Sequence, residues 1–292
     1  MEDFNLKFSQ DDDHPYWRRS AVLTSKHQKL ALIEHSFLES CGLLVTESSL
    51  DTDQFGTFSG EVERTLPPLE TAICKARLGM GVTGIRMGLA SEGSIGADPM
   101  IPFLTSDIEL MVLVDDERGI VISETYRSLE IIAVRKEILP RESLTEFLKK
   151  ADFPHHKLIA KAKFDGSTEC FKAISSLAQL ESAMDICTEN SPTGVVVLES
   201  DLRANQSPSR QKNIRRLAGL LALRVSHLCP KCGTPGWGRV SYLRGLRCAL
   251  CSRILPEAIR AEVLGCVSCE FTQSGSVIAE VADPAICTWC NP

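Results

Sequence analysis

Eight of the twelve cysteines form four C-x-x-C pairs within the last 64 residues of the chain. The pairs are Cys229/Cys232, Cys248/Cys251, Cys266/Cys269 and Cys287/Cys290. Each C-x-x-C pair directs two thiolates at one point, and two pairs supply the four sulfur ligands of a tetrahedral zinc site. The first and second pairs are 15 residues apart and the third and fourth are 17 apart, which fits four-cysteine zinc sites. The sequence therefore predicts two zinc ions.

The four C-x-x-C pairs, called knuckles below, can combine into two four-cysteine sites in more than one way. Sequential pairing, first with second and third with fourth, is the simplest, and it makes each unit resemble a zinc ribbon with residues 238–245 as a short strand pair. Cross-braced pairing, first with third and second with fourth, is the alternative. Because sulfur takes all four positions in either case, no position is left for water, and we expect both ions to be structural.

The start of the chain and its hydropathy indicate where the protein works. The chain begins with the acidic segment MEDFNLKFSQDDDH, whereas a signal peptide has a basic start and an apolar middle. We therefore expect a cytoplasmic protein in which disulfides are a poor explanation for the cysteines. No apolar run reaches the roughly 18 residues of a membrane-spanning helix, so no membrane association is predicted.

The formal net charge of −6 is unevenly distributed along the 292 residues. Residues 1–201 carry 33 acidic and 20 basic side chains, whereas residues 202–256 contain no Asp or Glu. The basic stretch 203–253 holds eleven Lys and Arg: Arg203, Arg210, Lys212, Arg215, Arg216, Arg224, Lys231, Arg239, Arg244, Arg247 and Arg253. This stretch either meets phosphate on a nucleotide or RNA, or complements the acidic body and the four-thiolate metal centres.

Hydrophobic periodicity predicts a mixed α/β body. A strand at 21–24, a helix at 27–41 and a strand at 43–46 form a β-α-β start, with Gly42 as the glycine that ends the helix. Further elements are expected as helices at 68–80, 143–150, 174–187 and 209–225, and as strands at 85–90, 107–114, 119–134, 157–163 and 194–199. We predict a lead-in over residues 1–20, an α/β nucleotide-binding-like domain over 21–225 with a mixed central sheet and flanking helices, and a small double zinc-ribbon domain over 226–292.

Polar segments follow several of these strands, where ligands bind in open α/β sheets. The turn from Thr24 to Lys29 opens a helix, and its hydroxyls, lysines and amides suit phosphate. Ser91 to Ser94 is expected as a polar turn that places Glu92 as a metal ligand or general base. Residues 199–203 put two acids and an arginine at another strand end. Four acids of a long loop could hold Mg²⁺: Asp51, Asp53, Glu61 and Glu63.

The order of five segments resembles the non-canonical purine nucleoside triphosphate pyrophosphatases. VLTSKHQKLALIEHSFLESCGLLV is similar to their opening T/S-x-N-x-x-K strand and helix through Thr24 and Lys29, with Lys26 in place of the asparagine. ERTLPPLETAICKAR resembles their E-x-x-x-x-x-x-E-N-A-x-x-K-A segment through Glu63 and Lys75, with Thr71 in place of the asparagine. LASEGSIG and IELMVLVDDERGIVI resemble the acidic turn and the hairpin that follow. SPSRQKNIRRLAGLLA resembles their late S-H-R helix through Arg210.

This resemblance implies an inosine triphosphatase-like fold and Mg²⁺-dependent hydrolysis of a nucleotide between its α and β phosphates. Glu92 and Glu63 would hold the metal or activate water. The triphosphate would bind Thr24, Lys29 and Lys75, and Arg210 would contact the base or a phosphate. The whole chain, knuckles included, also resembles a bacterial family described only as a domain of unknown function.

A different class of function remains open beside the enzyme. The basic stretch 203–253 and the zinc ribbons also suit a non-enzymatic module that binds RNA or protein. A zinc enzyme is less favoured, because the six histidines are dispersed and no water-open ligand set is apparent. His155 and His156 are adjacent on a predicted strand, where neighbours face opposite ways, so we expect them at the surface.

Overall fold

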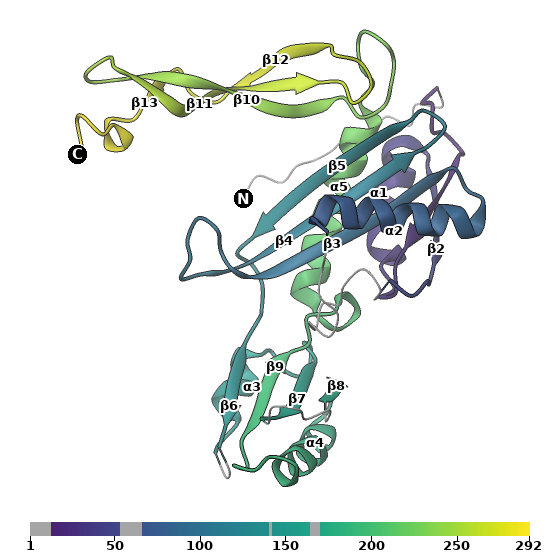
Figure 1. The fold of residues 1–292 in the computed structure, drawn as a ribbon, viewed down its shortest axis with the longest axis vertical. Coiled ribbons are helices and arrows are strands. Elements are labelled where there is room, and N and C mark those ends of the chain that lie inside the picture. The colour runs from purple at the N-terminus through teal and green to yellow at the C-terminus, as the bar shows by residue number, and fades with distance from the viewer. Residues whose placement is uncertain (1–12, 53–65, 140–141, 164–169) are drawn as a thin grey trace.

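The computed structural model describes residues 13–52, 66–139, 142–163 and 170–292. These residues form an elongated molecule with three β-sheets, each at a different level (Figure 1). A five-stranded sheet lies in the middle, a four-stranded sheet lies at one end, and a long four-stranded arm crosses the other end. The mixed α/β class is confirmed, but the strands of residues 21–225 are divided between two sheets instead of sharing one.

The first sheet has the order β2-β1-β3-β4-β5. Its strands are β1 (Ser20–Thr24), β2 (Leu44–Ser48), β3 (Met87–Ala97), β4 (Thr105–Asp115) and β5 (Ile120–Ser128). β1 runs parallel to both β2 and β3, and β3, β4 and β5 form an antiparallel meander. The turn expected from Ser91 is wrong: β3 continues because each residue as far as Ala97 pairs with β4. β3 therefore extends well beyond the end of β1.

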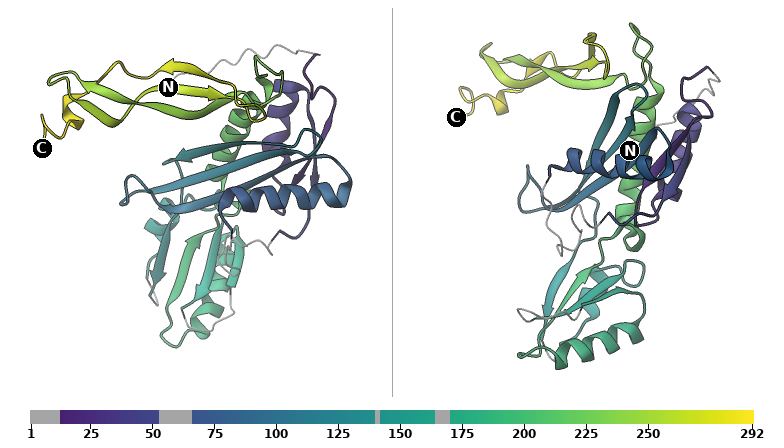
Figure 2. Two further views of the ribbon diagram at one scale, coloured as in Figure 1. Left: turned by 45° about the horizontal axis from the view of Figure 1, so that its top comes forward. Right: turned by 45° about the vertical axis from the view of Figure 1, so that its right-hand side comes forward.

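Helices cover both faces of this sheet. α1 (Leu30–Cys41) packs against α5 (Pro208–Ser226) on one face, and α2 (Pro68–Thr83) lies on the opposite face (Figures 1 and 2). Successive residues of β3 alternate between them, so Leu89 joins the core with α1 and α5, and Ala90 joins the core with α2. After β1 the chain crosses one face to reach β2, and then crosses the other face to reach β3. The carboxyl end of β1 is thus a topological switch point, where open α/β sheets bind ligands.

The end of α1 confirms the glycine expected at position 42. Gly42 adopts φ +65°, and its amide hydrogen-bonds to the carbonyl of Leu38. A Cβ atom built on Gly42 would lie 1.9 Å from the ring of Trp17, so the backbone and the packing both require glycine here. This contact attaches the segment before β1 to the end of the helix.

We expect Gly42→Ala to lower the free energy of unfolding by about 2–4 kcal/mol, because it combines a positive φ with a steric clash. Gly84→Ala is the matched control: Gly84 also caps a helix at φ +74°, but a Cβ there would have no atom within 4 Å. The control should lose only about 1–2 kcal/mol from the positive φ alone. Urea titration of both variants measures the difference, and equal losses would show that the contact with Trp17 has no weight.

The second sheet has the order β6-β9-β7-β8 and is antiparallel throughout. Its strands are β6 (Arg135–Ile138), β7 (Leu158–Ala162), β8 (Cys170–Ile174) and β9 (Val196–Ser200), and its helices are α3 (Thr145–Lys150) and α4 (Leu177–Glu189). Leu158, Leu180 and Leu198 belong to a core that is separate from the core of the first sheet. The chain then returns to the first sheet through α5, so the second sheet is inserted between β5 and α5.

The arm is a twisted sheet of order β12-β11-β10-β13. Its strands are β10 (Gly238–Cys248), β11 (Ile254–Gly265), β12 (Thr272–Val277) and β13 (Val281–Ala282). The strand pair expected within residues 238–245 is wrong, because these residues belong to the single strand β10, which pairs with β11. None of the helices in the described part of the chain is long and apolar enough to cross a membrane.

Candidate functional site

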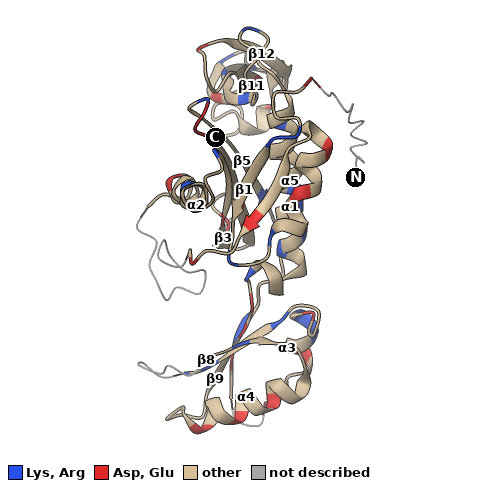
Figure 3. Ribbon diagram, turned by 90° about the vertical axis from the view of Figure 1, so that its right-hand side faces the viewer, with Lys and Arg blue, Asp and Glu red and all other residues tan. Residues whose placement is uncertain are grey.

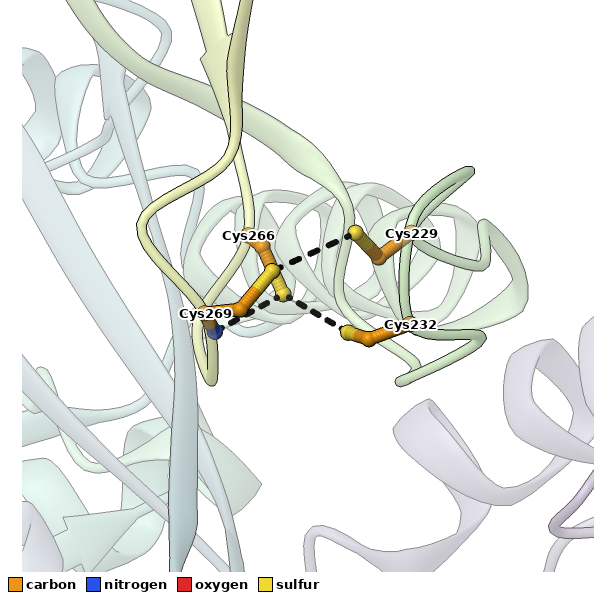
Figure 4. A group of neighbouring side chains, drawn as sticks. All are labelled: Cys229, Cys232, Cys266 and Cys269. Atoms are coloured by element: carbon orange, nitrogen blue, oxygen red, sulfur yellow. Dashed lines mark hydrogen bonds between the residues drawn. The ribbon is translucent and has the colours of Figure 1, made fainter.

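The eight knuckle cysteines form two groups of four at opposite ends of the arm. Cys229, Cys232, Cys266 and Cys269 make the proximal group, beside the end of α5 (Figure 4). Cys248, Cys251, Cys287 and Cys290 make the distal group. The first knuckle therefore pairs with the third and the second with the fourth, which is the cross-braced alternative. The sequential pairing is wrong.

The path of β10 and β11 explains this pairing. β10 starts near the first knuckle and ends at the second, and β11 runs back antiparallel and ends at the third. An antiparallel hairpin of this length brings the first and third knuckles together at one end. The second knuckle remains at the far end, where the last residues of the chain bring the fourth.

The sulfur positions suit a tetrahedral metal ion. Sγ to Sγ distances are 3.8 Å for Cys229–Cys269 and 3.6 Å for Cys232–Cys266. In the distal group, the Sγ distances are 3.8 Å for Cys248–Cys290 and 3.7 Å for Cys251–Cys287. Four ligands about 2.3 Å from a central zinc lie about 3.8 Å apart, whereas a disulfide requires about 2.05 Å. Each group can hold a metal ion such as zinc.

Hydrogen bonds within the knuckles favour the thiolate form that binds metals. The hydroxyl of Thr234 lies 3.2 Å from Cys232 Sγ, and this contact lowers the pKa of Cys232 to about 6. Backbone amides of Cys251 and Leu250 lower the pKa of Cys248 to about 7, and the amide of Leu250 lies 3.4 Å from its sulfur. Although a backbone hydrogen bond at Phe271 opposes the shift, burial and the neighbouring sulfurs instead raise the pKa of Cys269 to about 11. Hydrogen bonding to Cys251 and burial raise the pKa of Cys290 to about 12. Each group thus has one cysteine that ionises readily and one that does not.

A second constellation, the buried charge cluster, lies at the carboxyl end of β1. Its members are charged side chains from the β1–α1 turn, α2, β3, β4 and α5, none more than 8% exposed: Lys29, Lys75, Glu92, Asp107, Glu109 and Arg210. Charged side chains are rarely buried to this extent unless they are paired. The cluster contains three cations and three carboxyl groups.

The pairs lie on both faces of β3. On the α2 face, Lys75 Nζ lies 2.6 Å from Glu92 Oε1. On the opposite face, Lys29 Nζ donates to Ser91 Oγ at 2.9 Å. Lys29 can reach Ser91 because β3 extends beyond the end of β1.

Arg210 of α5 reaches the same region from the α5 face. Its Nε donates to Glu109 Oε1 at 2.5 Å, and its Nη1 donates to the carbonyl of Leu202 at 2.7 Å. Asn213, one turn along α5, donates to Asp107 Oδ2 at 2.8 Å. Gly93 of β3 leaves room for this arrangement, since a Cβ there would lie 2.3 Å from Arg210 Nη2 and 2.6 Å from Glu109 Oε1.

Burial and neighbouring charges shift two pKa values within the cluster. Burial and then the positive charge of Arg210 lower the pKa of Lys29 to about 8, although Glu109 and Glu92 oppose the shift. Burial and then the charge of Glu109 raise the pKa of Asp107 to about 7, although the hydrogen bond from Asn213 opposes it. Both groups therefore change charge within two pH units of neutrality, as groups in proton-transfer sites often do.

The structure brings four of the sequence-predicted residues into this cluster: Lys29, Lys75, Glu92 and Arg210. Thr24 is buried, but it lies against α2, where its Oγ1 is 2.1 Å from the position of a Cβ on Gly79. Glu63 lies outside the described residues, as do Asp53 and Glu61. Asp51, the remaining acid of that loop, is exposed and pairs with Lys26.

Residues 199–203 do not join the cluster as a group. Glu199 pairs with Lys161 at 2.5 Å in the second sheet, and Asp201 pairs with Arg203. The sequence interpretation missed Asp107, Glu109 and Asn213. Their signal was present: Asp107 and Glu109 alternate within an otherwise apolar strand, which places them on one face, and Asn213 follows Arg210 by one helical turn.

The basic stretch 203–253 does not form one basic surface. Six of its eleven cations have acidic partners: Arg203, Arg210, Lys212, Arg224, Arg239 and Arg244. In Figure 3, segments with Lys or Arg and segments with Asp or Glu are both scattered over the ribbon. Among the described residues, acids of the body pair with four of these cations, and Glu262 and Glu257 of the arm pair with two more.

Comparison with known proteins identifies a family but assigns no activity. No curated protein matches the chain. A family model matches residues 75–292, a range that includes β3, β4, α5, the second sheet and all eight knuckle cysteines. The chain therefore belongs to the family described as a domain of unknown function, DUF6671.

Proposed function

We propose that the buried charge cluster binds the phosphates of a nucleoside triphosphate together with Mg²⁺ and hydrolyses the nucleotide. The observation that carries this proposal is the convergence of Lys29, Lys75 and Arg210 with Glu92 and Glu109 at the switch point of the first sheet. The β1-α1-β2 order and the long β3–β4 hairpin also support the inosine triphosphatase-like fold, which we propose for this part of the chain.

The internal ion pairs suggest how the ligand is accommodated. Two buried carboxylate oxygens, Asp107 Oδ1 and Glu109 Oε2, have no hydrogen-bond partner among the described residues. Carboxylate oxygens are the ligands that Mg²⁺ prefers, and lysine and arginine side chains suit phosphate oxygens. When Mg²⁺ and a triphosphate bind, the carboxylates exchange their cationic partners for the metal, and the cations exchange the carboxylates for phosphate. The cations and carboxylates of the cluster balance one another before binding, and Mg²⁺ offsets part of the negative charge that the triphosphate brings.

In the proposed reaction, water attacks the α-phosphorus and pyrophosphate leaves as the bond between the α-phosphorus and its bridging oxygen breaks. Glu92 accepts the proton of the attacking water. Lys29 and Lys75 stabilise the charge that develops on the phosphate oxygens, and Arg210 orients the nucleotide. Asp107 and Glu109 would hold the Mg²⁺, which would supply polarisation of the phosphates.

The test is the release of pyrophosphate from a panel of nucleoside triphosphates in the presence of Mg²⁺. We expect turnover with at least one nucleotide, and we expect Glu92→Gln to lower it by about 100-fold or more, the usual contribution of a general base. Glu146→Gln, an exposed residue of α3, is the control and should retain full activity. Absence of turnover with every nucleotide, or turnover that Glu92→Gln leaves unchanged, contradicts the proposal.

We also propose zinc as the ion of both four-cysteine groups, since an all-sulfur tetrahedral set with these spacings suits zinc. In this role the ions stabilise the arm and carry no chemistry of their own.

A binding role for the arm is the second candidate. The distal end exposes large apolar side chains: Leu250, Ile254, Val281, Ile286 and Trp289. Because many of the basic residues are paired with acids, this surface suits a protein partner better than RNA. Retention of labelled RNA on filters at two salt concentrations separates these alternatives, because RNA binding weakens steeply with salt.

A further inference from the structure

Three polar side chains meet where the second sheet contacts the start of α5. His156 follows α3 and is only 3% exposed, so the expectation that it lies at the surface is wrong. Its Nδ1 lies 2.9 Å from Asp152 Oδ2, and its Nε2 lies 2.9 Å from Ser209 Oγ. Ser209 is 53 residues away in sequence and belongs to the first turn of α5. The order carboxylate, imidazole and hydroxyl is that of an activated serine.

The neighbours of His156 define which ring nitrogen carries the proton. Asp152 is ionised, because the hydrogen bond from His156 holds the pKa of this carboxyl below its usual value. A carboxylate only accepts hydrogen bonds, so Nδ1 must carry the hydrogen. The backbone amide of Ser209 lies 3.1 Å from Nε2 and can only donate, so Nε2 carries the lone pair.

The hydroxyl of Ser209, 2.9 Å from Nε2, can donate to this same lone pair, which the backbone amide also approaches. The backbone amide of Ile132 donates to the same Oγ at 3.1 Å, which orients the side chain. Ser209 is half-buried as a residue, and the labelling experiment below tests whether a small reagent reaches its hydroxyl. The first turn of α5 also provides the positive end of a 19-residue helix, which stabilises negative charge on a nearby oxygen.

We propose that Ser209, His156 and Asp152 form a second catalytic site, in which Ser209 is the nucleophile toward a carboxylic ester. Ser209 Oγ forms a bond to the carbonyl carbon and passes its proton to His156 Nε2. The bond from that carbon to the alcohol oxygen then breaks, and the alcohol leaves with the proton from Nε2. Water next gives a proton to Nε2 and attacks the acyl carbon. The bond from that carbon to Ser209 Oγ then breaks, Oγ takes the proton back from Nε2, and the carboxylic acid leaves. Asp152 maintains the orientation and tautomer of the imidazole throughout.

The competing interpretation is that His156 only caps α5. A cap needs the contact between Nε2 and the amide of Ser209, and it requires neither Asp152 nor a reactive hydroxyl. The two interpretations therefore differ in reactivity rather than in stability, and reactivity is the property to measure. The site shares no side chain with the buried charge cluster, so its test is independent of nucleotide hydrolysis.

The experiment treats the full-length protein with a fluorophosphonate probe, locates the adduct by mass spectrometry and follows hydrolysis of p-nitrophenyl acetate. We expect an adduct on Ser209, none on that peptide in Ser209→Ala, and a labelling rate at least about 100-fold lower in His156→Gln and in Asp152→Asn. His155→Gln is the matched control, since His155 contacts the same Asp152 at 3.3 Å without reaching Ser209. It should label at the wild-type rate.

Thermal melting accompanies each variant. Asp152 is 45% exposed at its side chain, so Asp152→Asn remains informative even where His156→Gln unfolds. The proposal is overturned when the folded wild-type protein gives no adduct on Ser209. It is equally overturned when the adduct forms at the same rate in a folded Asp152→Asn variant.

Discussion

Replacing Cys232 and Cys266 together by serine will remove one zinc ion per chain, whereas replacing Cys232 and Cys248 together will remove both. The first pair of substitutions falls within the proximal group, and the second pair damages the proximal and the distal group. A structural zinc site contributes roughly 10–16 kcal/mol of apparent binding free energy. We therefore expect the second variant to lose the ordered arm, while the first retains its distal half.

The number of zinc ions per chain distinguishes the two variants. It is measured by elemental mass spectrometry after gel filtration. Cys74→Ser, which changes a cysteine of α2 outside both groups, should retain two zinc ions. Sequential pairing would reverse the result, with two ions lost in the Cys232/Cys266 variant and only one lost in the Cys232/Cys248 variant. One ion lost in the Cys232/Cys248 variant would therefore contradict the cross-brace.

Asp107→Asn will stabilise the protein at pH 8, and the gain will shrink as the pH falls. Burial, followed by the charge of Glu109, raises the pKa of Asp107 from its usual value of 3.8 to about 7. Between these two values the folded state binds more protons than the unfolded state, so wild-type stability falls as the pH rises from about 4 to 7. Asparagine cannot ionise and avoids this loss.

At 1.36 kcal/mol per pKa unit, the gain at pH 8 is about 4 kcal/mol, of which about 2 kcal/mol is lost on lowering the pH to about 5.5. Urea titrations of the wild type and the variant at the two pH values measure this difference in the free energy of unfolding. The four-cysteine groups are identical in both proteins, so their contribution cancels from the difference. Asp116→Asn removes a more exposed aspartate that pairs with Arg77, and it should change stability by about 0.5 kcal/mol or less. A pH-independent difference for Asp107→Asn would show that the aspartate is ionised throughout.

The metal ligands were predictable because the ligand chemistry is local. Four C-x-x-C pairs specify the eight sulfurs from their spacing alone. Their pairing was not predictable, because it depends on how far β10 extends before β11 returns. The length of that hairpin is set by which residues of β10 and β11 pair with each other. The spacing of the cysteines carries no information about that pairing.

The buried charge cluster was predictable only in part. Lys29 and Glu92 were found from their places after predicted strands, and Lys75 and Arg210 through a resemblance between segments. Glu92 was nevertheless expected in a turn, because Gly93 and Gly96 are typical of turns. Pairing with β4 overrides that local preference, and Gly93 instead makes room for Arg210. His156 was misplaced for a similar reason, since its partner Ser209 is contributed by a distant helix.

The two four-cysteine groups close the arm at both of its ends. A metal ion in each group would therefore fix β10 and β11 relative to each other at both ends of the arm. A slip of one residue would turn every side chain to the other face of the sheet, and neither end can accommodate it while both groups are intact. A residue inserted between the knuckles of one strand must consequently be matched in the other strand or absorbed as a bulge. Register shifts of this kind are already present between Arg239 and Ser241 and between Leu243 and Arg244. The arm can thus vary in surface chemistry far more freely than in length.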